Sequence, residues 1–308
     1  MKVSVVIPLY NKALHIERAL CSVLAQTIQD LEIVVIDDGS TDNSAAVVSG
    51  IRDSRIRLIH QANAGVSGAR NRGVVESCHE FVAFLDADDE WLPEFLESVT
   101  TAVQRVPEAG VVFTNLRLST SEEPWLPRQG GGRLEDYFEF FVKCQGHGMS
   151  SSSILIKKDV LQRVGGFPFF QTHGEDIDTW ARLAWEVPVA YVPEVLALYH
   201  VTGTPRAMDA RRGQIAASLE RCAQVCRDRL RQGKVPPRLR KSTQSYANML
   251  YSMCAREQKD AGDTGEAYKT LLKSLCLVTT LQDLRIFTAA LLRTTCPTGI
   301  LGIIRQLR

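Results

Sequence analysis

The sequence lacks the patterns that mark several large protein classes. No uninterrupted apolar run is long enough to span a bilayer. The eight cysteines are scattered, without a C-x-x-C pair or a zinc-ligand spacing, which predicts reduced thiols rather than disulfides or a zinc site. Neither G-x-G-x-x-G after the first predicted strand nor G-x-x-x-x-G-K-[ST] occurs. These absences argue against a membrane-spanning protein, a disulfide or zinc scaffold, the usual dinucleotide-binding unit and a P-loop protein.

The composition that remains is that of a globular protein with an uneven charge. The chain has 308 residues, of which 45% are hydrophobic and 23% charged, enough to bury a core. Basic minus acidic residues give 17 − 27 = −10 for residues 1–204, 11 − 3 = +8 for 205–241 and 8 − 5 = +3 for 242–308. An acidic part suits a metal, and a basic part suits phosphates or an anionic membrane surface. The alternative is a set of solvated helix faces.

Short apolar runs alternate with helical patterns in the first 90 residues. The predicted strands are residues 3–7, 33–36, 57–59 and 81–85, with helices over 13–26, from 43, and around 69–72 between them. This alternation predicts βαβ units and an α/β fold with a mainly parallel sheet. The first strand starts directly after Met1-Lys2, so no signal peptide is expected and the protein is predicted to be cytoplasmic.

Polar residues follow each predicted strand. They are Tyr10 and Asn11, Asp37 and Asp38, Asn63 and Gly65, and Asp86 and Asp88. In open α/β sheets the ligand binds at the carboxyl ends of the strands. The small-residue loop 61–68 allows close backbone approach, and the helix after it favours an anion at its N-terminus. One crevice of this kind suits a nucleoside diphosphate.

The acidic stretch 86–90 directly follows the fourth strand. Asp86 and Asp88 are two residues apart, so a tight turn can aim both carboxylates at one point. Such oxygen ligands suit Mg²⁺ or Mn²⁺, which take one or two carboxylates together with substrate phosphates. The alternative is a cap for the next helix, with Asp88 or Asp89 at the N-cap and Pro93 in the first turn.

Four segments in this order resemble family 2 glycosyltransferases. They are Ser4–Asn11, Val35–Asp42, Gly65–Gly73 and Phe84–Asp89. The resemblance covers residues 1–204 and implies a GT-A fold, the Rossmann-like fold of nucleotide-diphospho-sugar transferases. It also implies a nucleotide-sugar donor, UDP-linked by default, a divalent cation (Mn²⁺ or Mg²⁺), and inversion at the anomeric carbon.

The resemblance also implies roles for individual residues. The nucleotide-binding set is Pro8, Tyr10, Glu17, Asp37, Asp38, Asn63, Gly65, Arg70, Asp86 and Ala87, and the metal set is Asp88, Asp86 and His200. Three of these have plain alternatives: Glu17 as a surface helix acid, Asp37 as a turn cap, and Arg70 as a solvated helix arginine rather than a diphosphate ligand.

A second group of motifs lies near residue 175. Gly165-Gly166-Phe167 and Gly174-Glu175-Asp176 resemble the family's glycine-glycine-phenylalanine and glutamate-aspartate motifs. An inverting transfer needs a base for the acceptor hydroxyl, and the resemblance assigns Asp176, with Glu175 second. The alternative is an acid-rich helix start. His200 stands where the family often has tyrosine-arginine-x-histidine, but the arginine is missing. No Q-x-x-R-W motif occurs, which argues for addition of one sugar.

From residue 205 onward the pattern is helical and basic, which predicts a C-terminal appendage over 205–308. The apolar tail 283–308 is interrupted by Arg285, Arg293 and Pro297. It suits a helix pair at a membrane surface, or packing on the protein's own helices or on another subunit.

The prediction is therefore an inverting glycosyltransferase of bacterial surface-polysaccharide synthesis, acting on a glycan or lipid-linked glycan. We expect the protein in the cytoplasm or at the inner face of the membrane. A homo-oligomer is an open alternative, and no nucleic-acid partner is expected. The alternatives are a sugar-nucleotide pyrophosphorylase, disfavoured because residues 8–15 hold no glycine, and a non-catalytic nucleotide-sugar-binding subunit.

Overall fold

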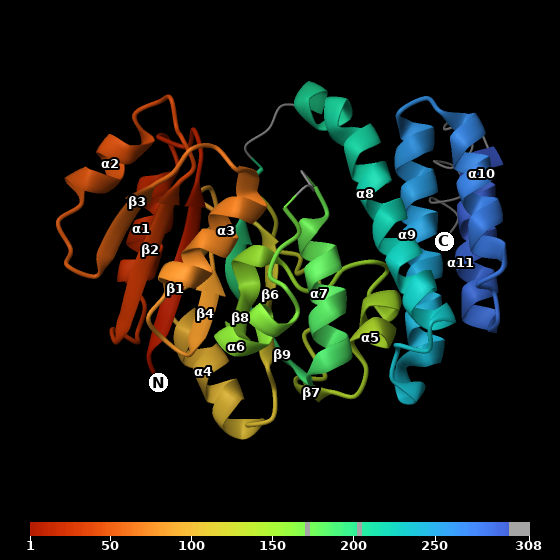
Figure 1. The fold of residues 1–308 in the computed structure, drawn as a ribbon, viewed down its shortest axis with the longest axis horizontal. Helices are drawn as coiled ribbons and strands as arrows, with labels where there is room; N and C mark the ends of the chain where they lie inside the picture. The colour runs from red at the N-terminus through yellow and green to blue at the C-terminus, as the bar shows by residue number, and fades with distance from the viewer. Residues whose placement is uncertain (170–172, 202–204, 296–308) are drawn as a thin grey trace. The chain divides into compact units, whose positions relative to one another are not determined.

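The chain folds into two compact units. A computed structural model describes residues 1–169, 173–201 and 205–295 (Figure 1). The first unit comprises Met1–Tyr137 with His147–Thr202, and the second comprises Phe138–Gly146 with Gly203–Arg308. The short segment 138–146, which the sequence places in the 1–204 domain, thus belongs to the second unit.

One sheet of nine strands runs through the first unit. The strands are β1 (Val3–Leu9), β2 (Leu31–Asp37), β3 (Ile56–His60), β4 (Phe81–Phe84), β5 (Glu90–Trp91), β6 (Val111–Leu118), β7 (Gly132–Leu134), β8 (Ile154–Lys157) and β9 (Val189–Tyr199). Their order is β3-β2-β1-β4-β8-β6-β9-β5, with β7 paired to β9. Strands β3, β2, β1 and β4 are parallel, as predicted. Strands β6 and β9 also pair in parallel, and β8, β5 and β7 join the sheet through antiparallel pairs.

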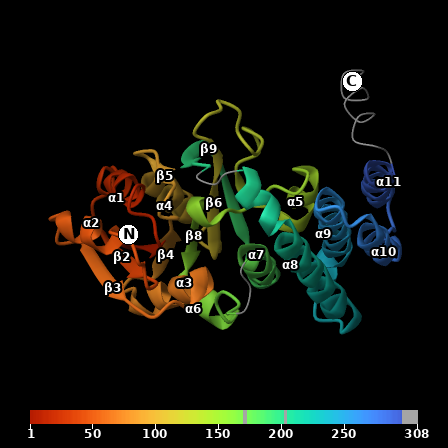
Figure 2. The same ribbon diagram turned by 90° about the horizontal axis from the view of Figure 1, so that it is seen from above.

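Helices cover both faces of this sheet (Figure 2). One face carries α1 (Ile16–Leu24), α2 (Ser44–Gly50) and α4 (Phe95–Arg105); the other carries α3 (Gly65–Glu76), α6 (Lys158–Arg163) and α7 (Glu175–Glu186). The odd-numbered residues of β1 are buried against the first set, since strand side chains alternate between faces. Val6, on the opposite face, contacts α3. The result is a three-layer α/β unit.

Two sequence expectations need correction in this unit. Helix α3 begins at Gly65, so residues 65–68 form its first turn rather than the end of a loop. The capping interpretation of the acidic stretch is wrong, because α4 begins only at Phe95, after Glu94, and no side chain caps it. Asp88 and Asp89 lie in the turn between β4 and β5 instead.

The second unit is helical. It contains α5 (Tyr137–Lys143, from Phe138 on), α8 (Pro205–Arg231), a 3₁₀ turn (Pro237–Leu239), α9 (Arg240–Asp260), α10 (Thr264–Leu275) and α11 (Leu281–Thr295). The rings of Phe138 and Phe141 pack edge-on against Tyr246, and their centroids lie 5.1 and 4.7 Å, respectively, from that of the Tyr246 ring. The predicted helical appendage is thus confirmed, and α5 contributes to its core.

The described part of the tail packs within its own unit. Phe287, Leu291 and Ala290 of α11 contact a small apolar cluster on α9 and α10 that includes Leu271. This favours the alternative of packing on the protein's own helices up to residue 295. The tail's remaining apolar residues, Ile300, Leu301, Ile303 and Ile304, lie outside the described residues. Within residues 1–169, 173–201 and 205–295, no helix is long and apolar enough to cross a membrane.

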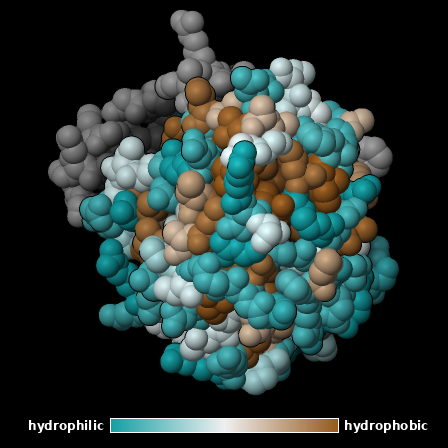
Figure 3. Space-filling model, turned by 90° about the vertical axis from the view of Figure 1, so that its left-hand side faces the viewer, coloured by the Kyte–Doolittle hydropathy of each residue, from teal (hydrophilic) through white to brown (hydrophobic). Residues whose placement is uncertain are grey.

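Strand β3 forms one edge of the sheet, and its Arg57 and His60 are exposed. Figure 3 shows this side of the molecule, where hydrophilic side chains are interspersed with hydrophobic ones. Charged side chains on an edge strand discourage pairing with another chain.

Helix α3 approaches β1 so closely that Gly73 leaves no room for a side chain. A Cβ at Gly73 would lie 2.2 Å from Cγ1 of Val6, whereas a Cβ at Gly50 would meet nothing within 4 Å. We expect Gly73→Ala to lower the free energy of unfolding by roughly 1–3 kcal/mol, because helix and strand must separate. Gly50→Ala should change it by less than about 1 kcal/mol. Urea denaturation of both variants tests this, and equal effects would contradict the close approach.

Candidate active site at the carboxyl ends of the parallel strands

The parallel arrangement brings the predicted nucleotide-binding residues to one edge of the sheet. Strands β2, β1 and β4 are neighbours, and their carboxyl ends are followed by Asp38, Tyr10 and Asp86. Pro8 lies inside β1, one residue beyond the predicted strand end, and Tyr10 is 48% exposed. Ala87 is buried in the turn after β4. This edge therefore presents an exposed ring and several carboxylates together.

Asp37 and Asp38 are both buried but hold different partners. Asp37 accepts a hydrogen bond from the Ser40 backbone N–H (3.1 Å) and pairs with His60 Nδ1 (2.8 Å). Burial alone would raise the pKa of Asp37, but hydrogen bonds from Ser40 and His60 outweigh it and lower the pKa. The contact with Ser40 stabilises the turn after β2, which is the alternative role of Asp37 as a turn cap.

Asp38 is arranged to accept a further hydrogen bond. Its Oδ1 accepts from Gln61 Nε2 (2.7 Å) and from the backbone N–H of Ala64 (2.8 Å). In the described part of the chain, Oδ2 has no hydrogen-bond partner. A carboxylate held in this way can accept from a base N–H or a ribose hydroxyl.

The remaining residues of the predicted nucleotide-binding set are Glu17, Asn63 and Gly65. They lie near the same strand ends, and no described hydrogen bond joins them to Asp37 or Asp38. Glu17 is exposed on α1. Asn63 is exposed and accepts from the backbone N–H of Gly65 (3.3 Å), which opens α3.

Arg70 on α3 joins two acidic segments that are far apart in the sequence. Its Nη2 donates to Asp86 Oδ1 and its Nη1 to Glu175 Oε1, each at 2.7 Å, and the side chain is only 3% exposed. The guanidinium also lies 5.3 Å from the centroid of Phe167. Burial alone would lower the pKa of Arg70, but the charges of Asp86 and Glu175 outweigh it and raise the pKa. The alternative of a solvated helix arginine is therefore wrong.

The two carboxylates of the D-x-D triplet each contact a cation. Asp86 is paired with Arg70, and Asp88 with Lys12 Nζ. Arg18 donates to the backbone carbonyl of Asp88. In the part of the chain that the structure describes, no three His, Cys, Asp or Glu side chains gather into a metal-binding group.

Asp89 and His200 connect the acidic turn to the end of β9. Asp89 is buried, accepts from Ser152 Oγ (2.5 Å), and accepts from the backbone N–H of His200 (3.0 Å). Burial first, and then the charge of Asp86, raises the pKa of Asp89 to about 7. The His200 ring lies 3.2 Å from Glu90 Oε2. The backbone of His200 is thus held beside the acidic turn.

The first turn of α7 presents Glu175 and Asp176. The helix begins after Gly174, and Asp176 is partly exposed. Burial first, and then the charge of Glu175, raises the pKa of Asp176 to about 7, although Arg70 acts in the opposite direction. A carboxylate whose pKa lies near neutrality is suited to general-base catalysis.

The glycine-glycine-phenylalanine turn is tied to α3 and α7. The Asn71 side chain donates to the carbonyl of Phe167 (2.7 Å) and accepts from its N–H (2.8 Å). Gly166 has a φ of 66°, and a Cβ there would lie 2.5 Å from Asn71 Oδ1. Arg182 donates to the carbonyl of Gly166 (2.8 Å). These contacts place Phe167 under Arg70.

Three rings form a cluster near the acids. The ring of Trp125 lies 5.5 Å from Tyr199 and 5.9 Å from His147. Tyr199 is 39% exposed, and burial followed by the charges of Asp89 and Asp88 raises its pKa to about 12. Partly exposed rings beside carboxylates form an amphipathic surface. Trp125 lies between β6 and β7, and His147 in the segment before β8.

The sequence interpretation missed several residues that organise this site. Lys12, Asn71 and Ser152 were not assigned roles, yet they contact Asp88, Phe167 and Asp89. Their partners lie 76, 96 and 63 residues away in the chain. Asn71 stands in a matched motif, which was a usable signal, whereas Lys12 and Ser152 had none.

Comparison with protein families gives one match. Residues 4–165 match the model described as glycosyl transferase family 2. A GalNAc(5)-diNAcBac-PP-undecaprenol beta-1,3-glucosyltransferase of Campylobacter jejuni is 27% identical over 299 residues, covering 90% of this chain and 89% of that protein. An uncharacterised glycosyltransferase of Nostoc sp. is 47% identical over 115 residues, 36% of each chain. The match thus spans about a third of the Nostoc protein's length.

Two solved structures have a similar fold. A mannosyltransferase from Pyrobaculum calidifontis in complex with GDP-Man and Mn²⁺ aligns with a TM-score of 0.62 at 21% identity, covering 95% of this chain and 85% of that one. S. aureus TarS 1-349 in complex with UDP aligns with a TM-score of 0.60 at 17% identity, covering 90% and 89%. At these identities the likeness concerns the fold.

Arg70 offers a direct test of the site's organisation. Arg70→Met leaves Asp86 and Glu175 without their common cation, so we expect a loss of about 3 kcal/mol or more in the free energy of unfolding. Arg72→Met removes a half-exposed arginine from the same helix, where its pair with Glu76 contributes less than about 1 kcal/mol.

Chemical denaturation measures both variants. Adding Glu175→Gln to Arg70→Met should recover part of the loss, because one unpaired carboxylate is then neutral. If Arg70→Met costs no more than Arg72→Met, the bridge does not organise the site.

Proposed function

Since the chain belongs to glycosyltransferase family 2 and adopts the GT-A fold, we propose that it transfers one sugar from a nucleoside-diphosphate sugar to an acceptor hydroxyl, with inversion at the anomeric carbon. The observation that carries the proposal is the Arg70 bridge. It links the acidic turn after β4, which is proposed to face the donor, with the start of α7, which carries the proposed base Asp176. In this proposal, residues 1–204 form the catalytic domain and 205–308 its helical appendage.

The donor nucleotide is proposed to bind along the ends of β1 and β2. Tyr10 is exposed there, and Asp38 Oδ2 is directed by two hydrogen bonds on its partner oxygen. Pro8, Glu17, Asp37, Asn63, Gly65 and Ala87 complete the proposed surroundings. UDP is the proposed nucleotide, and the complexes of two structural relatives with UDP and with GDP-Man support nucleotide-sugar binding.

Asp86 and Asp88 are the residues proposed to hold Mn²⁺ or Mg²⁺, with His200 nearby. Two carboxylates fit such an ion, because it takes few protein ligands when substrate phosphates supply the others. In the structure their charges are paired with Arg70 and Lys12. When bound, the ion would neutralise charge on the departing diphosphate. Lys12 and Arg70 place further positive charge beside the same carboxylates.

Asp176 is proposed as the base that takes the proton from the acceptor hydroxyl, with Glu175 as its neighbour. Arg70 pairs with Glu175, and no described hydrogen bond joins Arg70 to Asp176. This favours Asp176 for proton transfer. Burial, and then the negative charge of Glu175, raises the pKa of Asp176, so Asp176 holds an abstracted proton better than an ordinary aspartate does.

The acceptor is proposed to be a glycan or a lipid-linked glycan in bacterial surface-polysaccharide synthesis. The activity of the Campylobacter relative, on an undecaprenol-linked glycan, supports this class. The ring cluster of Trp125, His147 and Tyr199 offers a flat surface for a sugar near the acids. A place in the cytoplasm, at or near the inner face of the membrane, follows from such an acceptor.

Replacing the proposed base should separate chemistry from binding. We expect Asp176→Asn to reduce kcat by about 10²–10⁴, because an amide cannot accept the proton, while nucleotide binding persists. Asp159→Asn, on the exposed surface of α6, is the matched control and should keep full activity. Transfer to a lipid-linked acceptor and titration with UDP measure the two properties. Full activity of Asp176→Asn would rule out this assignment.

The pH dependence gives a second test of the base. Asp176 must be deprotonated to act, and its pKa is raised to about 7. We therefore expect kcat/KM to fall as the pH drops below 7 and to level off above it, since this ratio reports the free enzyme. Initial rates at constant ionic strength measure the profile. A profile that is flat through pH 7 would contradict the role of Asp176.

A further inference from the structure

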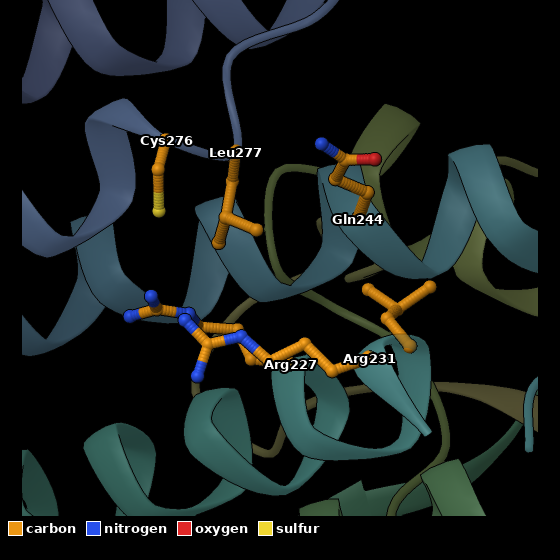
Figure 4. Close-up of a pocket in the computed structure, with 6 residues that line it drawn as sticks. Arg227, Arg231, Gln244, Cys276 and Leu277 are labelled. Atoms are coloured by element: carbon orange, nitrogen blue, oxygen red, sulfur yellow. The ribbon is translucent and has the colours of Figure 1, made fainter. Parts of the chain in front are cut away.

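The second unit contains a pocket that the transfer reaction does not use. It has a volume of about 340 Å³ and is lined by Arg227, Leu230, Arg231, Gln244, Cys276 and Leu277 (Figure 4). These residues come from α8, α9 and the end of α10, all within the helical unit. The volume lies at the lower end of the range for small-ligand sites, about 300–1,000 Å³.

Two positively charged arginine side chains line this pocket. Arg227 and Arg231 are four residues apart on α8, the spacing at which like charges on a helix destabilise each other. The carboxylate of Asp228 lies 4.0 Å from Arg231, at the limit of an ion pair between largely exposed groups. Segment 205–241 as a whole carries 11 − 3 = +8 charges. An anion between the two guanidinium groups would relieve their repulsion.

Arg227 is held in place. It donates to the Tyr251 hydroxyl (3.3 Å) and lies 5.8 Å from the centroid of that ring. The Tyr251 hydroxyl in turn donates to Gln224 (3.2 Å). The hydrogen bond with Tyr251 is the main cause that raises the pKa of Arg227, so its charge is permanent. A fixed guanidinium loses little further conformational entropy when it binds an anion.

The rest of the lining is mixed in character. Leu230 and Leu277 contribute apolar surface, and Gln244 contributes an amide. Figure 4 shows the thiol of Cys276 directed toward the two arginines. Arginine pairs bind phosphate oxygens through several parallel hydrogen bonds. We propose that this pocket binds a phosphate group.

Phosphate of this kind has two sources, the headgroup of an anionic lipid and a soluble phosphate compound. Both present the same oxygens to Arg227 and Arg231, so the experiment must distinguish them. Cys276 is exposed and lines the pocket, and its alkylation therefore reports occupancy. Cys21 and Cys78 are also exposed, lie in the first unit, and serve as internal references.

The test uses the full chain and follows iodoacetamide labelling of each cysteine by peptide mass spectrometry. The probes are pyrophosphate, phosphatidylcholine vesicles, and the same vesicles containing phosphatidic acid, with flotation as a parallel readout. We expect pyrophosphate or the phosphatidic acid vesicles to slow the alkylation of Cys276 and not of Cys21 or Cys78. Protection by pyrophosphate indicates a soluble source, and protection by phosphatidic acid vesicles alone indicates a lipid.

Substitutions decide whether the pocket is responsible. Arg231→Gln removes one charged contact and should weaken protection about tenfold or more in probe concentration. Arg221→Gln makes the same charge change on an exposed residue of α8 that does not line the pocket, and should leave protection unchanged. The proposal is overturned if no probe protects Cys276 in the wild-type chain, or if both variants weaken protection equally.

Discussion

A positive charge buried between two acidic segments is the interaction on which the site depends. Asp86 and Glu175 offset the cost of burying the charge of Arg70, and these carboxylates lose their common partner without it. Because Asp86 follows β4 and Glu175 opens α7, the ion pairs fix the distance between the turn after β4 and the start of α7. The ring of Phe167 lies against the guanidinium of Arg70, and the Asn71 side chain hydrogen-bonds to the Phe167 backbone.

The parallel part of the sheet explains why the other polar groups meet. Strands β2, β1 and β4 run in the same direction, so the residues after them lie at one edge. Buried apolar side chains fix each strand, and the polar residues begin where that pattern stops. The carboxylates thus gather because hydrophobic burial aligns the strands, and their repulsion is offset by Arg70, Lys12 and Arg18.

Much of this arrangement was predictable from local sequence. The four parallel strands and the turns after them follow from apolar runs that end in Asp, Asn or Gly. The antiparallel strands β5 and β7 were harder, because Glu90–Trp91 and Gly132–Leu134 are too short to show a period. The start of α3 at Gly65 was missed because glycine and serine usually signal a loop.

The partners within the site could not be predicted in the same way. The contacts of Lys12 with Asp88 and of Arg70 with Glu175 join residues 76 and 105 positions apart, so no local pattern encodes them. The burial of Arg70 depends on Phe167 and on the helix packing around it. The proposed role of Asp176 came from a resemblance, and its raised pKa agrees with that proposal, since burial and then the charge of Glu175 raise the pKa to about 7.

The most direct measurement is isothermal titration of the full chain with UDP, GDP, CDP and dTDP, in Mn²⁺ and again in EDTA. The account predicts that one diphosphate binds in Mn²⁺, that EDTA weakens this binding strongly, and that Asp88→Asn has the same effect as EDTA. If none of the four binds in Mn²⁺, the strand ends do not form a nucleotide-sugar site and the proposed transfer fails.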